Sequence, residues 1–316
     1  MKKTILAILS VAAVVMSTSC QRDPILYPTS DYYVAVKVNI DTDRDPAAAE
    51  PTLYVASFYD TLSHKLLHRA YIRPASHPAG LPPGGYVQGI EPGAYDMLVY
   101  NIDSRVTTVE NADYYPQVYA RTGVNTYSGN TPIIYAPDHL YVCSERVHVP
   151  YITAEDGVYV IDSELSSVAE PWRVIVRGIR NLDIVQGLSF LLSGQTRGVM
   201  LSDRAKLSER AIVLFAGAVD SVAVKSGEGL QVDTRYNTFG KLAGDDLRCL
   251  MTLTVMGPNG SVYYVQEDVT QQILESQDTD RTIIIDADIE IRPREDGGFA
   301  PVAEPWNPSV VTIDLE

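Results

Sequence analysis

The side chains of this sequence that could support chemistry are its histidines, carboxylates and cysteines. His64 and His68 stand four residues apart, and on a helix that spacing would place two imidazoles on one face as part of a metal site. The residues before them, Tyr-Asp-Thr-Leu-Ser at 59–63, are typical of a hairpin turn between strands, where such a pair does not converge. No acidic third ligand is patterned nearby. We therefore expect no metal at these histidines.

The carboxylates give no more specific signal. Asp41, Asp43 and Asp45 imitate the start of a calcium-binding loop, but Pro46 stands where the sharp turn needs glycine, and no glutamate follows at the twelfth position. A solvated acidic loop is the expected structure. Two carboxylates suited to glycoside hydrolysis could meet from any two strands, and the 40 acidic residues of the chain make such a pair impossible to assign.

Sequence motifs for other chemistry are missing as well. The chain has no Gly-x-Ser-x-Gly elbow, no phosphate-binding glycine loop and no Cys-x-x-Cys pair. We therefore predict no catalytic residue, no cofactor, no metal site and no enzymatic activity. A β-sandwich hydrolase with scattered carboxylates stays open as an alternative, because such sites leave no local signature.

Cys20 is the cysteine whose position points to a modification. Lys2 and Lys3 precede an apolar run at residues 5–16, which is typical of a secretory signal peptide. The ending Ser-Thr-Ser at 17–19 followed by Cys20 resembles a lipoprotein signal, in which the cysteine thiol takes a diacylglycerol and the chain is cut before it. We predict a signal peptide at residues 1–19 and a lipidated cysteine with a short spacer at residues 20–30. An ordinary signal peptide with an incidental cysteine is the alternative, since a larger aliphatic residue is usual at position 17.

The charge of the chain excludes one class of partner. It has 25 basic and 40 acidic residues, a formal charge of −15, and loss of Lys2 and Lys3 would bring this to −17. Such a chain repels phosphate backbones, so we expect no nucleic acid partner. No stretch after the signal approaches the roughly 20 apolar residues of a membrane span. Contact with a membrane is therefore expected only through the lipid.

The elements that must position any site are short strands. Apolar and polar residues alternate at 32–40, and at 283–291 five apolar residues share one face while three acids share the other. Thirteen similar runs follow the signal, with glycine and proline between most of them: 53–59, 70–73, 95–102, 147–152, 158–161, 172–179, 188–192, 212–215, 221–224, 230–236, 247–256, 262–266 and 310–315. The pattern predicts an all-β fold of two sandwich domains, at residues 31–150 and 151–316.

Two further features carry expectations about the strands. Cys249 is in phase with apolar neighbours and is expected to be a buried thiol, whereas a disulfide between Cys143 and Cys249 is the alternative. Gly93 and Gly240 are expected at turns whose backbone angles disfavour a Cβ.

Several short clusters resemble those of the fimbrillin-like cell-surface lipoproteins of the Bacteroidales. They are mostly turn residues that lead into or out of strands, at 92–101 (Pro-Gly-Ala-Tyr-Asp-Met-Leu-Val-Tyr-Asn), 136–141, 178–182, 192–194, 237–240, 268–272 and 297–299 before Trp306. The resemblance covers nearly the whole chain after the signal.

This resemblance implies two tandem transthyretin-like β-sandwiches after a lipoprotein signal peptide. It also implies attachment to the outer membrane at the cell surface through Cys20, and a role as an anchor or accessory subunit of a fimbria. Other fimbrial subunits would be the partners, and open sandwich edges would contact them, because unpaired backbone groups there can accept a neighbour's strand.

Two alternatives remain at this point. The chain could be a surface glycan- or protein-binding lipoprotein that uses exposed aromatic side chains. The terminal run at 310–315 could be exchanged with a partner or could simply close its own sandwich.

Overall fold

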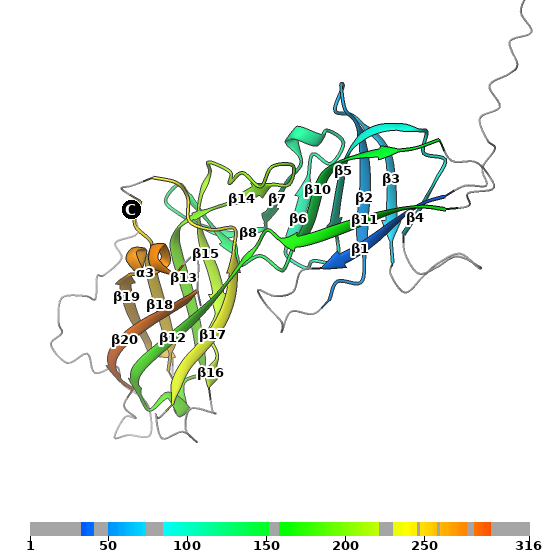
Figure 1. Ribbon diagram of the computed structural model, residues 1–316. Coiled ribbons are helices and arrows are strands. Elements are labelled where there is room, and N and C mark those ends of the chain that lie inside the picture. The colour runs from blue at the N-terminus through cyan, green and yellow to red at the C-terminus, as the bar shows by residue number, and fades with distance from the viewer. Residues whose placement is uncertain are drawn as a thin grey trace, which may run out of the picture.

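The computed structural model describes residues 33–40, 50–73, 85–151, 158–220, 230–244, 247–257, 260–276 and 281–291, and they form an almost entirely β structure (Figure 1). The strands make four sheets, of seven, six, four and three strands. This confirms the predicted all-β sandwich class, whereas the count of two tandem domains stays a prediction. Among the described residues no helix is both long and apolar enough to cross a bilayer.

The seven-stranded sheet folds over on itself. Its strand order is β3 (Leu66–Ile72), β2 (Tyr54–Asp60), β5 (Gly93–Asn101), β10 (Tyr141–Val149), β11 (Val158–Ser167), β1 (Tyr33–Ile40) and β4 (Gly85–Gln88). β10 and β11 pair at only two positions, so the sheet bends there, and β11 and β1 lie across the other strands (Figure 1). Between the two layers is a first core, which includes Val36, Phe58 and Met97.

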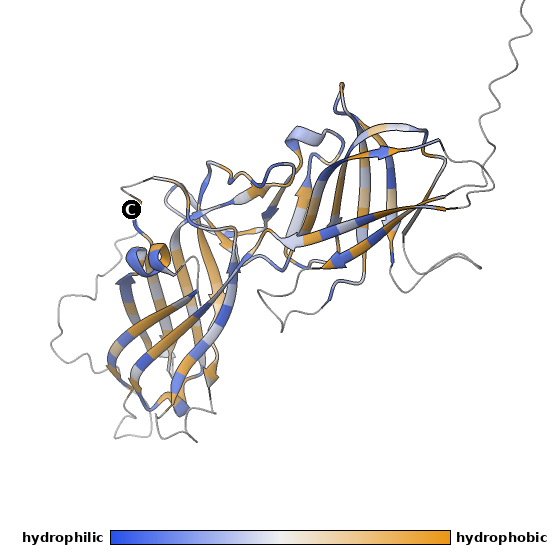
Figure 2. Cartoon of the chain, in the orientation of Figure 1, coloured by the Kyte–Doolittle hydropathy of each residue, from blue (hydrophilic) through white to orange (hydrophobic). Residues whose placement is uncertain are grey.

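A second sandwich is formed by the six- and four-stranded sheets. The six-stranded order is β19 (Val262–Asp268), β18 (Leu250–Met256), β13 (Gly187–Thr196), β15 (Arg210–Ala216), β9 (Thr131–Tyr135) and β8 (Val124–Ser128). The four-stranded order is β16 (Val219–Asp220), β17 (Gln231–Thr238), β12 (Glu170–Arg180) and β20 (Thr282–Glu290). Hydrophobic and hydrophilic residues alternate along these strands (Figure 2), because one face of each sheet is buried.

The second core lies between these two sheets. Phe215 stacks on Phe190 at 4.9 Å between ring centroids and on Tyr236 at 4.0 Å. In β20, Ile283 and Ile285 are buried while Asp286 and Asp288 are exposed, as the alternation predicts. The short helix α3 (Thr270–Glu275) follows β19, and the 3-10 turns η1 (Tyr115–Gln117) and η2 (Leu182–Ile184) complete the described elements.

A three-stranded sheet covers the outer face of the seven-stranded sheet. Its order is β14 (Gly198–Met200), β7 (Tyr119–Thr122) and β6 (Thr107–Glu110). A third core lies beneath it, where Leu98 and Tyr59 meet Val118, Val199 and Phe239. β2 and β5 are therefore buried on both faces, which explains their nearly continuous burial.

The third core joins the early and late parts of the chain. The hairpin β8–β9 comes from before residue 150, yet β9 pairs in parallel with β15 in the second sandwich. Conversely β14, from after residue 150, pairs with β7, and Phe239 lies in the third core. The predicted boundary at 150–157 lies between β10 and β11, which pair with each other. The division into 31–150 and 151–316 stays a prediction, and we expect the two parts to unfold together.

Some of the clusters that carried the resemblance to fimbrillin-like proteins meet in the fold. Asn101, buried at the end of β5, accepts a hydrogen bond from the Tyr141 backbone N–H at 2.7 Å and donates one to the His139 carbonyl at 3.2 Å. Gly178 forms a bulge in β12 with φ of +80°. These residues fix strand ends and strand bends, which is a structural role.

Candidate functional site

The sheet edges are the surfaces that the sequence analysis assigned to subunit contacts. Four sheets leave eight edge strands in the described part of the chain: β3, β4, β19, β8, β16, β20, β14 and β6. An edge strand presents backbone N–H and C=O groups that another strand can pair with, unless the protein covers them. The edges differ in how far they are covered.

None of the described residues covers the outer edge of β19. Val269 N–H donates to the Cys249 carbonyl, and Gly257 N–H donates to the Ser261 carbonyl. In an antiparallel pair with this register, the odd-numbered residues of β19 form the backbone hydrogen bonds to β18. The even-numbered residues Val262, Tyr264 and Gln266 therefore point their peptide groups away from β18. Within the described residues nothing hydrogen-bonds to these outward peptide groups.

The side chains along the β19 edge are apolar at one end. Tyr264 is 52% exposed and Val262 is 39% exposed, and Met256 beside them on β18 is 47% exposed. We call Val262, Tyr264 and Gln266 the β19 edge. It combines free backbone groups with exposed apolar side chains, which is the combination that soluble monomers usually avoid.

β20, the edge of the facing sheet, is protected. The Gln272 side chain from α3 donates from Nε2 to the Ile284 carbonyl at 3.0 Å and accepts the Ile284 N–H on Oε1 at 2.8 Å. One amide thus takes the place of a neighbouring strand at this residue. Beyond it, the exposed Asp286 and Asp288 carboxylates discourage strand pairing. The two edges on this side of the sandwich are therefore unequal.

β3 is covered at its start by the loop before η1. Leu66 N–H donates to the Asp113 carbonyl at 3.0 Å, and Lys65 forms a bridge with Tyr114. Arg69 fixes this loop by donating to the Ala112 carbonyl at 2.6 Å and to the Asp113 carboxylate at 3.1 Å. Further along β3, Tyr71 is 66% exposed.

The two histidines lie at the hairpin turn and on the following strand, as the sequence predicted. His64 ends the hairpin turn with φ of +59°, and His68 lies on β3 opposite Phe58. His64 Nδ1 is 3.6 Å from the Asp96 carboxylate, which already binds Arg146 at 2.9 Å. Burial lowers the pKa of His68, which keeps it uncharged near neutral pH. No group of three or more metal-binding side chains occurs among the described residues.

The two cysteines of the folded part are free thiols in different cores. Cys143 lies in the first core and Cys249 in the second, so the alternative of a disulfide between them is wrong. Burial is the main reason that the pKa of Cys143 is raised to about 12 and that of Cys249 to about 11. Both thiols are inert structural residues in the folded protein.

Other predicted residues lie outside the described part of the chain. Cys20, the predicted lipid site, is among them, as are Asp41, Asp43 and Asp45 and the terminal run at 310–315. The sequence identified 262–266 as a strand but carried no signal that it would be an edge. The cap at Gln272 was missed as well, because it depends on where α3 lies against β20.

Comparison with known proteins supports the fold. No protein-family model matches the chain, and no curated protein matches it. The structure of a candidate adhesin from Bacteroides ovatus matches with a TM-score of 0.55 and 19% identity, over 92% of this chain and 99% of that one. Because the identity is low, this likeness shows a common fold and nothing finer.

Weaker matches were found with other surface proteins. A candidate polysaccharide-binding protein from Bacteroides thetaiotaomicron matches with a TM-score of 0.49 and 12% identity, over 86% of this chain and 99% of that one. The fimbrial anchor protein Mfa2 from Porphyromonas gingivalis matches with a TM-score of 0.48 and 14% identity, over 86% and 95%. The matched proteins thus include a candidate adhesin and a fimbrial anchor protein. The conclusion about the fold rests on the Bacteroides ovatus structure alone.

Proposed function

We propose that this chain is a lipid-anchored, non-enzymatic anchor or accessory subunit of a surface fimbria. Cys20 would carry the lipid at the outer membrane, and the β19 edge would pair with a strand of another subunit. The observation that carries this proposal is the contrast between the two edges. β20 is capped by Gln272, whereas none of the described residues caps β19, on which Val262 and Tyr264 are exposed.

Strand addition suits this edge physically. A partner strand would satisfy the outward peptide groups of Val262, Tyr264 and Gln266 and would cover exposed apolar side chains. Backbone ladders supply affinity in such contacts, and the pockets between alternate side chains supply specificity. The fold shared with a candidate adhesin agrees with a surface role, and the absence of catalytic motifs from the sequence agrees with a non-enzymatic one.

The alternative function, binding of a glycan or protein through exposed aromatic side chains, has less support. Trp172 is 3% exposed in the second core and cannot stack on a ligand, and Trp306 lies outside the described residues. The most exposed tyrosines of named strands are on different sheets or at different edges, Tyr71 on β3, Tyr127 on β8 and Tyr264 on β19. They do not make a common aromatic surface.

A proline substitution tests the proposal at one backbone atom. Tyr264 points its N–H outward, so Tyr264→Pro removes a donor for the partner strand while leaving the ladder to β18 in place. Tyr264→Thr is the matched control, because it shortens the side chain but keeps the N–H.

The readout is recovery of fimbrial subunits, identified by mass spectrometry, with each variant purified from its own cells. We expect the proline variant to keep its melting temperature within a few degrees and to lose these subunits, and the threonine variant to retain most of them. Undiminished recovery with a folded Tyr264→Pro protein would contradict docking at the β19 edge.

A further inference from the structure

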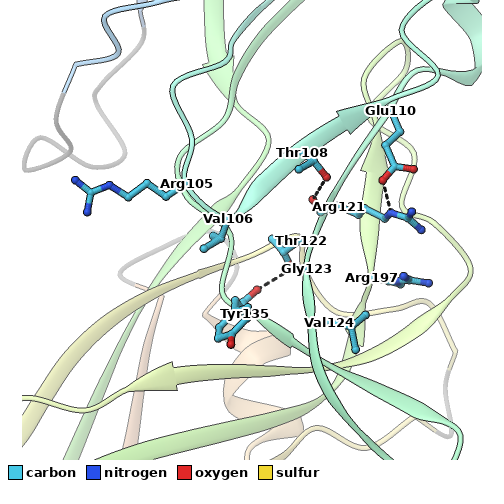
Figure 3. A pocket seen from close by; sticks show the side chains of 10 residues that line it. All are labelled: Arg105, Val106, Thr108, Glu110, Arg121, Thr122, Gly123, Val124, Tyr135 and Arg197. Atoms are coloured by element: carbon cyan, nitrogen blue, oxygen red, sulfur yellow. Dashed lines mark hydrogen bonds and ion pairs between the residues drawn. The ribbon is translucent and has the colours of Figure 1, made fainter.

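A groove lined by arginines opens beside the three-stranded sheet, away from the β19 edge. It lies where β7 continues into β8 through Gly123, and it has a volume of about 450 Å³. Figure 3 shows Arg121 and Arg197 on one side of it, with Tyr135 across from them and Glu110 beyond Arg121. Volumes of this size are typical of small-ligand sites in proteins.

Each of the two arginines is paired with one carboxylate, Arg121 with Glu110 and Arg197 with Glu209. Both oxygens of Glu110 are already occupied, one by Arg121 Nε at 2.6 Å and the other by the Tyr119 hydroxyl at 2.7 Å. The hydrogen bond from Tyr119, more than that from Arg121, lowers the pKa of Glu110, so this carboxylate is charged at neutral pH. Glu110 therefore fixes the orientation of the Arg121 side chain.

The arginines keep donors that have no acceptor. Arg121 uses only Nε in its pair with Glu110, and within the described residues its terminal nitrogens bond to nothing. Arg197 donates from Nη1 to Glu209 at 2.6 Å, while its Nε is buried and has no acceptor in that part of the chain. A buried guanidinium N–H without an acceptor costs free energy. The terminal nitrogens of Arg121 are the donors that remain for an incoming anion.

The cross-strand pairing places both arginines on neighbouring strands. Arg121 in β7 lies opposite Gly198 in β14, and Arg197 directly precedes that glycine. The Arg121 guanidinium is 5.7 Å from the centre of the Tyr119 ring, which supports its position. Tyr135 is 41% exposed, and its hydroxyl accepts a hydrogen bond from Asn125 Nδ2 at 2.6 Å, so its ring is held at the groove.

We propose that this groove binds an acidic polysaccharide, with a carboxylate or sulfate group on Arg121 and Arg197 and a sugar ring against Tyr135. Guanidinium groups bind both anions through paired N–H donors, and the C–H face of a sugar packs well on an aromatic ring. The β19 edge suits a protein partner better than the groove does, because the edge offers backbone hydrogen bonds and the groove offers side-chain donors. This inference does not depend on the proposed fimbrial role.

Gly123 permits a test that blocks the groove without altering its charges. Its φ lies outside the left-handed region, and a Cβ placed on it would meet no atom within 4 Å. Gly123→Leu should therefore fold normally and fill the groove. Arg121→Gln and Arg197→Gln remove one guanidinium each, and Arg180→Gln, an exposed arginine on β12 that does not line the groove, is the matched control.

Binding is measured by calorimetry on the full mature chain carrying Cys20→Ala, at about 0.15 M salt where screening acts over about 8 Å. The probes are oligogalacturonate for carboxylates, chondroitin sulfate oligosaccharides for sulfates, neutral maltoheptaose, and a hexaglutamate peptide. We expect at least one acidic oligosaccharide to bind with a Kd below 1 mM, and maltoheptaose not to bind. Each groove variant should weaken binding by about tenfold or more, and Arg180→Gln should not.

Three outcomes would overturn the proposal. The first is no binding of either acidic oligosaccharide, and the second is binding that Gly123→Leu leaves unchanged in a folded protein. The third is hexaglutamate binding as tightly as the oligosaccharides, which would reassign the groove to an acidic peptide. The two glycan probes then decide between carboxylate and sulfate.

Discussion

Phe239 offers a way to test whether the third core couples the two parts of the chain. Its side chain is 2% exposed and comes from the segment after β17, yet it packs with Leu98 and Val142 of the seven-stranded sheet. Replacing a buried phenylalanine by alanine costs about 3–5 kcal/mol. That is a large part of the roughly 5–15 kcal/mol that stabilises a typical protein. We therefore expect Phe239→Ala to weaken both parts together.

The two buried thiols report on the two parts separately. Cys143 lies in the first core and Cys249 in the second, and burial holds both thiol pKa values well above neutral. Neither reacts with a thiol reagent near pH 8 until its core opens. Single-cysteine proteins, made in the Cys20→Ala background, allow the urea midpoint of labelling to be measured for each core.

Coupled unfolding predicts one result for both thiols. With a slope of about 3 kcal/mol per molar urea, a loss of about 4 kcal/mol lowers the midpoint by somewhat more than about 1 M. Both midpoints should fall by the same amount in Phe239→Ala, and neither should change in Leu62→Ala, whose side chain is 89% exposed. A fall at Cys249 alone, with Cys143 unchanged, would refute the coupling.

The remaining predictions concern the lipid, two glycines, the Asp138 carboxylate and the terminal run. Cys20→Ala should move the protein from membranes to the soluble fraction; continued membrane retention without incorporation of labelled fatty acid would contradict the lipid site. Gly240→Val should lower stability by about 1–3 kcal/mol because φ there is +98°, whereas Gly93→Val should be nearly neutral in thermal unfolding. Burial opposes ionisation of Asp138, but hydrogen bonds from the Ser104 hydroxyl and from two backbone N–H groups outweigh it and lower its pKa. This stabilisation is present at pH values above the ordinary carboxyl pKa of about 3.9 and is lost as pH falls through the lowered pKa of the folded protein. Asp138→Asn should therefore reduce the pH dependence of the free energy of unfolding, measured in urea, between about pH 5 and 2. Removal of residues 309–316 should unfold the second sandwich if the terminal run closes it; a folded truncation with undiminished partner recovery would refute strand exchange.

The strands with strong patterns were predictable from the sequence. β20 alternates isoleucine and acid because one face meets the second core, and the predicted run at 283–291 matches it to within one residue. Cys249 is fully buried in phase with Met251 and Leu253, as expected. In these segments the burial of one face alone decides the local structure.

Other elements depend on distant contacts and were missed. β6, β7, β8, β9 and β14 are only three to five residues long, which gives little room for a pattern. β7 and β9 pair with β14 and β15, which lie far away in the sequence. β10 starts at Tyr141 and ends at Val149, whereas the prediction began at Val147 and continued past the end of the strand. Its earlier part is stabilised by pairing with β5.

The predictions for the two glycines were also only partly correct. Gly240 has the left-handed φ that was expected, but Gly93 begins β5 with an ordinary φ and with only the Tyr95 ring near its Cβ position, so that expectation was wrong. The candidate sites lay beyond prediction for a similar reason. Strand order decides that β19 is an edge, and the pairing of β7 with β14 brings Arg121 beside Arg197; neither relation is local in the sequence.

Crosslinking at the β19 edge in living cells tests the central claim most directly. A photoreactive phenylalanine at Tyr264 samples this edge, and the same residue at Tyr71, a more exposed tyrosine on the partly covered β3, is the control. We expect a covalent adduct with a fimbrial subunit from position 264 and little or none from position 71. An adduct of equal yield at both positions, or none with a fimbrial subunit at 264, would contradict it.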